Sequence, residues 1–194
     1  MFTVKSKLIS TVLMLACLVA TGSAQDEYEV DNSHTSLVFA ISHFNLSYTY
    51  GRFKKVSGNF QIDGGLANKF NFKVDAASID TNDEERDKHL RSPDFFNVEE
   101  FPEVTFESTQ ISREDGVYQV QGNMTMLGVT KPITIPIRLV GIGKGPFGKE
   151  RAGFFAKVTL KRSDFGMDKM MSAVGDNIAV TFSFEGIKTK SAKD

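Results

Sequence analysis

Tryptophan is absent from this 194-residue chain, and cysteine occurs once, as Cys17. The segment after Cys17 therefore has no disulfide and no thiol chemistry. An excess of one charge is also lacking, because 23 Lys and Arg face 24 Asp and Glu, which gives a formal net charge of −1. No basic stripe is visible, and this argues against a nucleic-acid partner.

Long apolar runs are missing too, with one exception near the start. Residues 8–20 are predominantly apolar, Lys5 and Lys7 precede them, and small residues follow. A membrane-spanning helix needs roughly 20 apolar residues, whereas this order is typical of a secretory signal peptide. We therefore expect residues 1–24 to be a cleaved signal peptide and residues 25–194 to form one domain in the periplasm.

Alternation of apolar and polar residues fills most of the remaining chain, which is the pattern of half-buried β-strands. It predicts eight strands, over residues 36–42, 59–62, 70–76, 104–107, 118–126, 133–139, 154–161 and 178–185. Glycine-containing turns between them imply antiparallel pairing. Eight such strands most simply close into a barrel, which leaves no exposed edge. The fold class is therefore mainly β, with a two-sheet sandwich as the alternative.

Two features interrupt the alternation. Residues 81–85 read Thr-Asn-Asp-Glu-Glu, which resembles a capping box with Thr81 or Asn82 as the N-cap. This predicts a short helical insert over residues 86–91. Pro136 lies within a predicted strand and cannot donate to a β-ladder, so we expect a bulge or an unpaired position there.

The polar residues assemble into no catalytic set. His34, His43 and His89 are far apart in sequence, whereas a metal site needs three or four convergent ligands. No nucleophile elbow and no phosphate-binding glycine loop is present. We therefore expect a protein that is not an enzyme, without catalytic residues, metal or other cofactor.

Phenylalanine and methionine are abundant, with 17 and 7 residues. Both suit an adaptable apolar lining. An eight-stranded barrel is either filled by its own side chains or holds one ligand. The alternation predicts which residues point inward, and it fits a packed core as well as a binding lumen.

Several segments form a recognisable set. They are Glu29–Phe39 with the following His43, Gly51–Phe53, Val56–Gly58, Arg86–Phe96, Phe101–Phe106, Gly122–Pro132 and Arg162–Met167. Together they resemble the YceI-like family of polyisoprenoid-binding proteins, over nearly all of residues 27–188. The resemblance implies a secreted, lipocalin-like barrel whose lumen takes a long isoprenoid chain. True lipocalins carry a Gly-x-Trp motif, so the likeness to them is architectural.

The ligand that this resemblance implies is an isoprenoid lipid or an isoprenoid quinone. Its expected contacts are the apolar strand faces, namely Leu37, Phe39, Ile41, Phe60, Phe72, Val74, Phe106, Val120, Met124, Ile135, Ile137, Phe154, Val158, Val180 and Phe182. For a head group at the barrel mouth, sequence neighbourhood suggests Arg52, Lys88, His89, Arg91, Phe95 and Phe96. Strands of about ten residues, tilted by about 40°, give a barrel roughly 25 Å tall, long enough for several isoprene units end to end.

The predicted function is passive binding, as a periplasmic carrier or buffer in transient contact with a membrane surface. The sequence leaves the oligomeric state open. Strand alternation also fits a small outer-membrane β-barrel, although the aromatic girdles of such a barrel are missing. An enzyme acting on a lipid or quinone is a further alternative, which the lack of a catalytic set disfavours.

Overall fold

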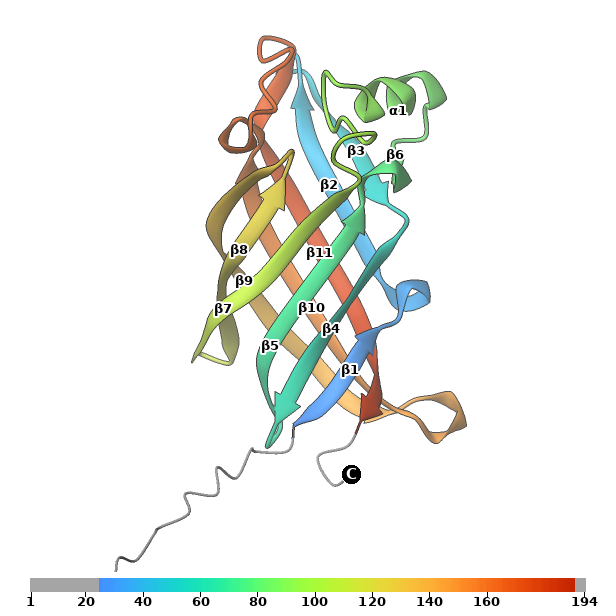
Figure 1. Ribbon diagram of the computed structural model, residues 1–194, viewed down its shortest axis with the longest axis vertical. Helices are drawn as coiled ribbons and strands as arrows, with labels where there is room; N and C mark the ends of the chain where they lie inside the picture. The colour runs from blue at the N-terminus through green and yellow to red at the C-terminus, as the bar shows by residue number, and fades with distance from the viewer. Residues whose placement is uncertain (1–24, 191–194) are drawn as a thin grey trace, which may run out of the picture.

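The computed structural model describes residues 25–190, so the expected signal peptide and residues 191–194 lie outside the described part. It is an elongated barrel with one helix at its upper end (Figure 1). The strands are β1 (Asp26–Val30), β2 (Ser36–His43), β3 (Ser47–Phe53), β4 (Val56–Asp63), β5 (Leu66–Asp75), β6 (Ile79–Asp80), β7 (Glu103–Glu114), β8 (Val117–Met126), β9 (Val129–Lys144), β10 (Glu150–Lys161) and β11 (Val174–Lys190). The helix α1 spans Glu84–Arg91.

A closed ring of eight strands forms the barrel. Its order is β1-β4-β5-β7-β8-β9-β10-β11, and β11 pairs back with β1. Every neighbouring pair in the ring is antiparallel. The predicted eight-stranded antiparallel barrel is therefore confirmed over the two-sheet sandwich.

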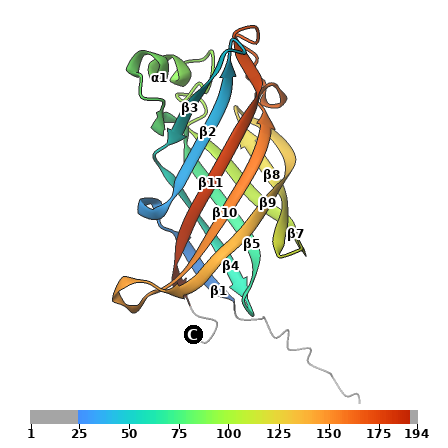
Figure 2. The same cartoon turned by 180° about the vertical axis from the view of Figure 1, so that it is seen from behind.

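The remaining strands extend the wall at the upper end. β11 pairs with β1 near its carboxyl end and with β2 over Val174–Ser183. β3 pairs with β2, and β6 pairs with β3. Seen from behind, β2, β11 and β10 run side by side along the molecule (Figure 2). All eight predicted segments are strands, whereas β1, β3 and β6 were not predicted.

The helical insert is present, but its N-cap differs from the prediction. Asp83 is the N-cap, and its side chain accepts a hydrogen bond from the Arg86 N–H. Asn82 takes a left-handed turn with φ 62°, which moves the helix start one residue further along the chain. The Thr81 hydroxyl instead donates to Asp87 at 2.6 Å. The expected cap at Thr81 or Asn82 is therefore wrong.

The upper part of β9 has one unpaired edge. β9 pairs with β8 over Val129–Arg138, but its pairing with β10 begins only at Ile137. Pro132 and Pro136 lie in the part that has no β10 partner. Proline has no N–H to donate, so it suits such an edge. Pro136 pairs with Gln119 of β8, so the unpaired position that it predicts is confirmed on the β10 side only.

The lower half of the barrel is solid. Tyr28, Phe60, Phe70, Phe154 and Phe184 are at most 1% exposed and belong to one cluster, which we call the lower core. The Phe154 ring centroid lies 5.1 Å from that of Phe60, 5.3 Å from that of Phe70 and 5.3 Å from that of Phe184. Aromatic pairs at 4.5–7 Å add stability beyond the area they bury.

Candidate functional site

The upper half of the barrel encloses a cavity of about 320 Å³, which we call the upper cavity. Phe72, Phe106 and Phe182 form its floor, because they line it and also pack on the lower core. The Phe182 ring lies 5.0 Å from Phe72 and 4.6 Å from Phe184. The volume is at the lower end of the roughly 300–1,000 Å³ of small-molecule sites.

Apolar side chains from most strands form the cavity wall. They include Leu37, Phe39 and Ile41 of β2, Val74 of β5, Met124 of β8, Ile135 of β9, Val158 of β10 and Val180 of β11. Residues two apart on one strand point to the same face, which is why alternation in the sequence places them together. Each of these residues was expected to contact a ligand, as were the floor residues Phe72, Phe106 and Phe182.

Four other residues of that predicted set do not line the upper cavity. Phe60, Val120, Ile137 and Phe154 are at most 1% exposed and lie in the same buried cluster as the lower core. These four inward-facing residues were expected to contact a ligand as well, but they do not border the upper cavity. Aromatic rings fill the lower half, so the space for a ligand is confined to the upper half.

The segment that includes α1 closes one side of the upper cavity. Phe95 and Phe96 both line the cavity, and they are 6% and 9% exposed. The Phe96 ring meets Phe53 of β3 edge to face, with centroids 5.5 Å apart. Phe165 and Met167 of the loop after β10 belong to the same buried cluster. The insert is therefore part of the cavity wall and part of a second, smaller core.

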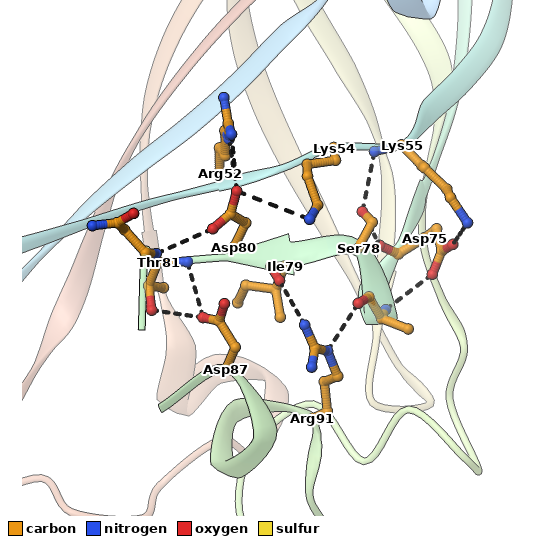
Figure 3. Close-up of polar contacts among 12 residues, drawn as sticks. Arg52, Lys54, Lys55, Asp75, Ser78, Ile79, Asp80, Thr81, Asp87 and Arg91 are labelled. Carbon is orange, nitrogen blue, oxygen red and sulfur yellow. Dashed lines mark hydrogen bonds and ion pairs between the residues drawn. The ribbon is translucent and has the colours of Figure 1, made fainter. Parts of the chain in front are cut away.

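Polar contacts fasten the insert to the barrel through the short strand β6 (Figure 3). The Asp87 carboxylate accepts from both the backbone N–H and the hydroxyl of Thr81, at 2.9 and 2.6 Å. The Arg91 guanidinium donates to the carbonyls of Ala77 and Ile79, at 2.9 and 3.0 Å. The middle and the carboxyl end of α1 are thus tied to residues 77–81.

A second set of charges holds β6 against β3. Arg52 donates to Asp80 from Nε and from its terminal nitrogen, at 3.1 and 2.9 Å. The Asn82 backbone N–H also donates to Asp80. These donors, Asn82 first and Arg52 second, lower the pKa of the Asp80 carboxyl. The carboxylate is therefore the stable form across the physiological range.

The six residues predicted to contact a head group fall into two sets, one that lines the upper cavity and one that does not. His89, Phe95 and Phe96 line the upper cavity together, and His89 also lies 3.2 Å from Asp94. Arg52 and Arg91 are engaged with β6 as described, and Lys88 is exposed on α1. These three do not line the cavity. A contact with a head group stays a prediction for all six.

Sequence reasoning missed a buried cation in the cavity wall. Arg162 is 1% exposed and lines the cavity. It donates to the carbonyls of Met167, Val174 and Gly175, each at 2.9 Å. Burial lowers the pKa of its guanidinium, but arginine stays charged in proteins. The sequence signal for Arg162 was the family segment Arg162–Met167, in which Arg162 was assigned no role.

The histidines lie apart in the structure. His34 contacts Asp31, His43 lies beside Phe44, and His89 contacts Asp94. Within residues 25–190, no group of three or more His, Cys, Asp or Glu side chains is placed to hold a metal ion. Over the same residues, none of the helices combines the length and the apolar character that crossing a membrane requires.

Fold and site together define a lipocalin-like β-barrel with one apolar internal cavity and a helical insert that covers it. The profile of the YceI-like domain matches residues 28–186. The chain belongs to the YceI-like family, as its sequence motifs suggest.

Relatives and solved structures agree with this assignment. The YceI proteins of Salmonella newport and Salmonella enteritidis are each 39% identical over 182 residues, which cover 91% of this chain and 95% of the relative. The structure of BcnA from Burkholderia cenocepacia has a TM-score of 0.72 at 25% identity, covering 80% of this chain and 98% of that one. The YCEI protein of Campylobacter jejuni has a TM-score of 0.69 at 28% identity, covering 77% and 90%.

A more distant structure shows the same fold. It is a polyisoprenoid binding domain from Saccharophagus degradans, implicated in plant cell wall breakdown. Its TM-score is 0.66 at 16% identity, and it covers 84% of this chain and 98% of that one.

Proposed function

We propose that this protein binds the apolar tail of one isoprenoid lipid, isoprenoid quinone or related amphipathic lipid in the upper cavity, and acts as its carrier or buffer in the periplasm. The observation that carries this proposal is the cavity itself, which is walled by aliphatic side chains and floored by phenylalanines. The fold of a polyisoprenoid binding domain supports the choice of ligand class.

The energetics favour a tail of several isoprene units. Each buried CH₂ contributes roughly 0.8 kcal/mol relative to water, whereas association costs about 4–15 kcal/mol. A few units therefore offset the cost when the competitor is water. A bilayer already keeps the same tail out of water, so net affinity relative to a membrane is modest. Modest net affinity suits a carrier or buffer, which must release its cargo.

The closed lower core limits how much of a ligand is held. Only the terminal part of a long tail fits below the mouth, and the head group stays outside, near His89 at the cavity edge. A protein of this kind selects for an apolar chain end and tolerates different head groups. We therefore expect a family of related lipids in the native protein.

The barrel exterior favours an aqueous compartment over the alternative of an outer-membrane barrel. Lys73 pairs with Glu103 across the outer face, and Lys157 is exposed on β10. The lipid-facing surface of an outer-membrane barrel is an apolar band instead.

Extraction of the purified native protein tests the ligand class. The mature protein is isolated from its own cells without detergent, extracted with organic solvent, and the extract is analysed by mass spectrometry. We expect isoprenoid chains in near-stoichiometric amount. Recovery of no lipid, or of phospholipid in the proportions of the whole membrane, contradicts the proposal.

A matched pair of variants separates cavity filling from loss of fold. Val158→Phe places a ring in the upper cavity, whereas Thr159→Phe places the same ring one residue along on the outer face. We expect Val158→Phe to lower bound lipid at least about tenfold with an unchanged circular dichroism spectrum. Thr159→Phe should retain wild-type lipid. Equal lipid content in the two variants rules out the upper cavity as the site.

Fractionation tests the compartment. We expect the protein in the fluid released by osmotic shock, with Gln25 as its first residue. A mature protein that retains Met1, or that is recovered only from detergent-treated outer membrane, contradicts this part of the proposal.

A further inference from the structure

Two loops at the upper end expose large apolar side chains around the cavity mouth. Phe44 and Leu46, in the turn between β2 and β3, are 55% and 88% exposed. Met170 and Met171, in the loop before β11, are 49% and 43% exposed. We call these four residues the rim. Met170 also lines the upper cavity, so the rim is continuous with the apolar interior.

The two loops are joined to each other. The Phe44 N–H donates to the Ala173 carbonyl at 2.6 Å, and His43 pairs with Val174. Both loops lie together at the upper end of the barrel in the two opposite views (Figures 1 and 2). The rim is therefore one surface, held in place by the strands that enclose the cavity.

The surroundings of the rim have no net charge and are amphipathic. Residues 44–51 contain no Asp, Glu, Lys or Arg, and the loop before β11 carries one exposed charge of each sign, Asp168 and Lys169, directly before Met170. Tyr48 and Tyr50, on the outer face of β3 just behind the rim, are 67% and 65% exposed. Tyrosine is enriched at the boundary between the apolar and the polar layers of a membrane, because its ring is apolar and its hydroxyl is polar.

We propose that the rim is a membrane-docking surface, which inserts shallowly into a lipid bilayer so that a ligand passes between bilayer and upper cavity without crossing water. The inference rests on the proposed function for the identity of the ligand. It adds the surface that docks and the partner, a lipid bilayer. Phe44, Leu46, Met170 and Met171 enter the outer acyl region, and Tyr48 and Tyr50 lie at headgroup level.

A bilayer fits this surface better than a second copy of the chain does. At about 200 Å² for a large side chain, the exposed part of the rim is roughly 400–500 Å². This is the size of a functional patch on a monomer. A symmetric pair of rims buries less than the roughly 1,200–2,000 Å² of a stable protein interface. A bilayer needs no matching shape, and a few inserted side chains give the weak, reversible attachment that transfer requires.

The lack of net charge at the rim also predicts how attachment to a membrane responds to salt. Because the exposed charges next to the rim, Asp168 and Lys169, are opposite in sign and cancel, insertion depends on apolar contact and not on anionic lipid. Attachment should therefore be similar on phosphatidylcholine vesicles at low salt and at about 0.5 M salt, where charge interactions are screened within a few ångströms.

Vesicle flotation with matched variants tests the proposal. Leu46→Ser with Met171→Ser removes two rim side chains that do not line the cavity. Leu66→Ser with Phe147→Ser is the control, since these residues are 49% and 102% exposed near the opposite end. The readouts are the vesicle-bound fraction, the rate of transfer of a fluorescent geranylgeraniol to vesicles, and its retention in the absence of vesicles.

We expect the rim variant to lower the bound fraction and the transfer rate by about tenfold, as the loss of two apolar contacts implies. Retention without vesicles should stay at the wild-type level, and the control should match wild type in all three readouts. Equal effects of both variants, or attachment that about 0.5 M salt abolishes, overturn the proposal. A wild-type dimer in size-exclusion chromatography that only the rim variant dissociates assigns the rim to a second copy instead.

The two proposals fail in different ways. Wild-type protein that retains the fluorescent lipid but never floats with vesicles contradicts the rim alone. Protein that floats through the rim but retains no lipid contradicts the proposed function alone.

Discussion

The lower core and the upper cavity share the strands β5, β10 and β11, and yet aromatic rings fill one region and leave the other open. In the lower half, Phe60, Phe70 and Phe154 meet at centroid distances of 5.1–5.9 Å. In the upper half, the same inward positions hold Val158 and Val180, whose side chains are shorter. Side-chain size is thus one of the two differences.

The other difference is the continuity of strand pairing in the wall. In the lower half, β1 closes the ring by pairing with both β4 and β11. In the upper half, β9 has no β10 partner before Ile137, and phenylalanines of the insert pack into the wall. A wall with interrupted strand pairing and smaller inward side chains encloses empty space. The comparison teaches that local strand pairing, as well as apolar composition, decides whether a barrel is packed or hollow.

The largest expected effect is on the packed side of this comparison. Phe60→Ala should lower the free energy of unfolding by about 3–5 kcal/mol, because the surrounding rings cannot close the cavity that the substitution leaves. Ile135→Ala, in the wall of the existing cavity, should cost less than about 2 kcal/mol, below the usual range for Ile→Ala, because few contacts are lost. Urea denaturation of both variants measures this. Equal losses would mean that the two halves are packed alike.

A smaller but sizeable effect is expected where the insert covers the cavity. Phe96→Ala should cost about 3 kcal/mol in chemical denaturation, the lower end of the range for buried phenylalanine. Phe96 also lines the cavity, so the same change should speed exchange of a fluorescent isoprenoid. Faster exchange without loss of stability would make the insert a gate only. Loss of stability with unchanged exchange would mean that Phe96 only packs in the second, smaller core.

The Asp31 carboxylate, which follows β1, should make the stability of the barrel sensitive to acid. Hydrogen bonds from Ser33, then Arg151 and His34, hold the pKa of the Asp31 carboxyl well below its usual range. Its pKa is therefore lower in the folded than in the unfolded chain, where it is about 3.9. The ionised carboxylate stabilises the fold above that pH, and the contribution is lost as the pH falls.

Asp31→Asn isolates this contribution. The variant should be less stable than wild type by about 1–3 kcal/mol at pH 7, since charged hydrogen bonds are lost. Its stability should then fall less steeply than that of wild type between about pH 5 and pH 2. Thermal unfolding over that range makes the measurement. Parallel pH profiles for the two proteins would place the acid sensitivity at other carboxylates.

The smallest effect is expected at the exposed edge of the upper half. The side chain of Arg52 is 62% exposed, and that of its partner Asp80 is 22% exposed. Arg52→Ala should change stability by about 0–1 kcal/mol, as is usual for surface ion pairs. Retention of a fluorescent isoprenoid should not change, because Arg52 does not line the cavity. A large loss of retention would restore Arg52 as a head-group contact.

Much of the fold could be predicted because strand alternation is a local signal. Leu37, Phe39 and Ile41 repeat every second residue and line one face of β2 as expected. β1 and β3 escaped prediction because their sequences, Asp26–Val30 and Ser47–Phe53, carry charged or outward-facing aromatic residues in place of a simple apolar repeat.

The division between packed and hollow halves could not be predicted, because it depends on distant residues. Phe60 and Phe72 have the same local pattern, but Phe60 fits only because Gly186 has no Cβ that would collide with its ring. Arg52 and Arg91 were assigned to the mouth by sequence neighbourhood, whereas their partners lie on or beside a strand of two residues. Arg162 lies in a polar segment whose sequence gives no sign of burial. In the structure its guanidinium is buried, and three backbone carbonyls accept its hydrogen bonds.

The pairing of β1 with β11 has a consequence for the time course of folding. These strands are the first and the last of the described chain, and the Thr189 hydroxyl donates to the Glu27 carbonyl across 162 positions. Contacts of such long range form slowly, because the ends must meet before any pairing is gained. Without β11 the ring is open, because β11 is the strand that joins β10 to β1. If the proposed lipid is present before the ring closes, it can reach the interior from the side, whereas the closed ring leaves the upper end as the proposed route.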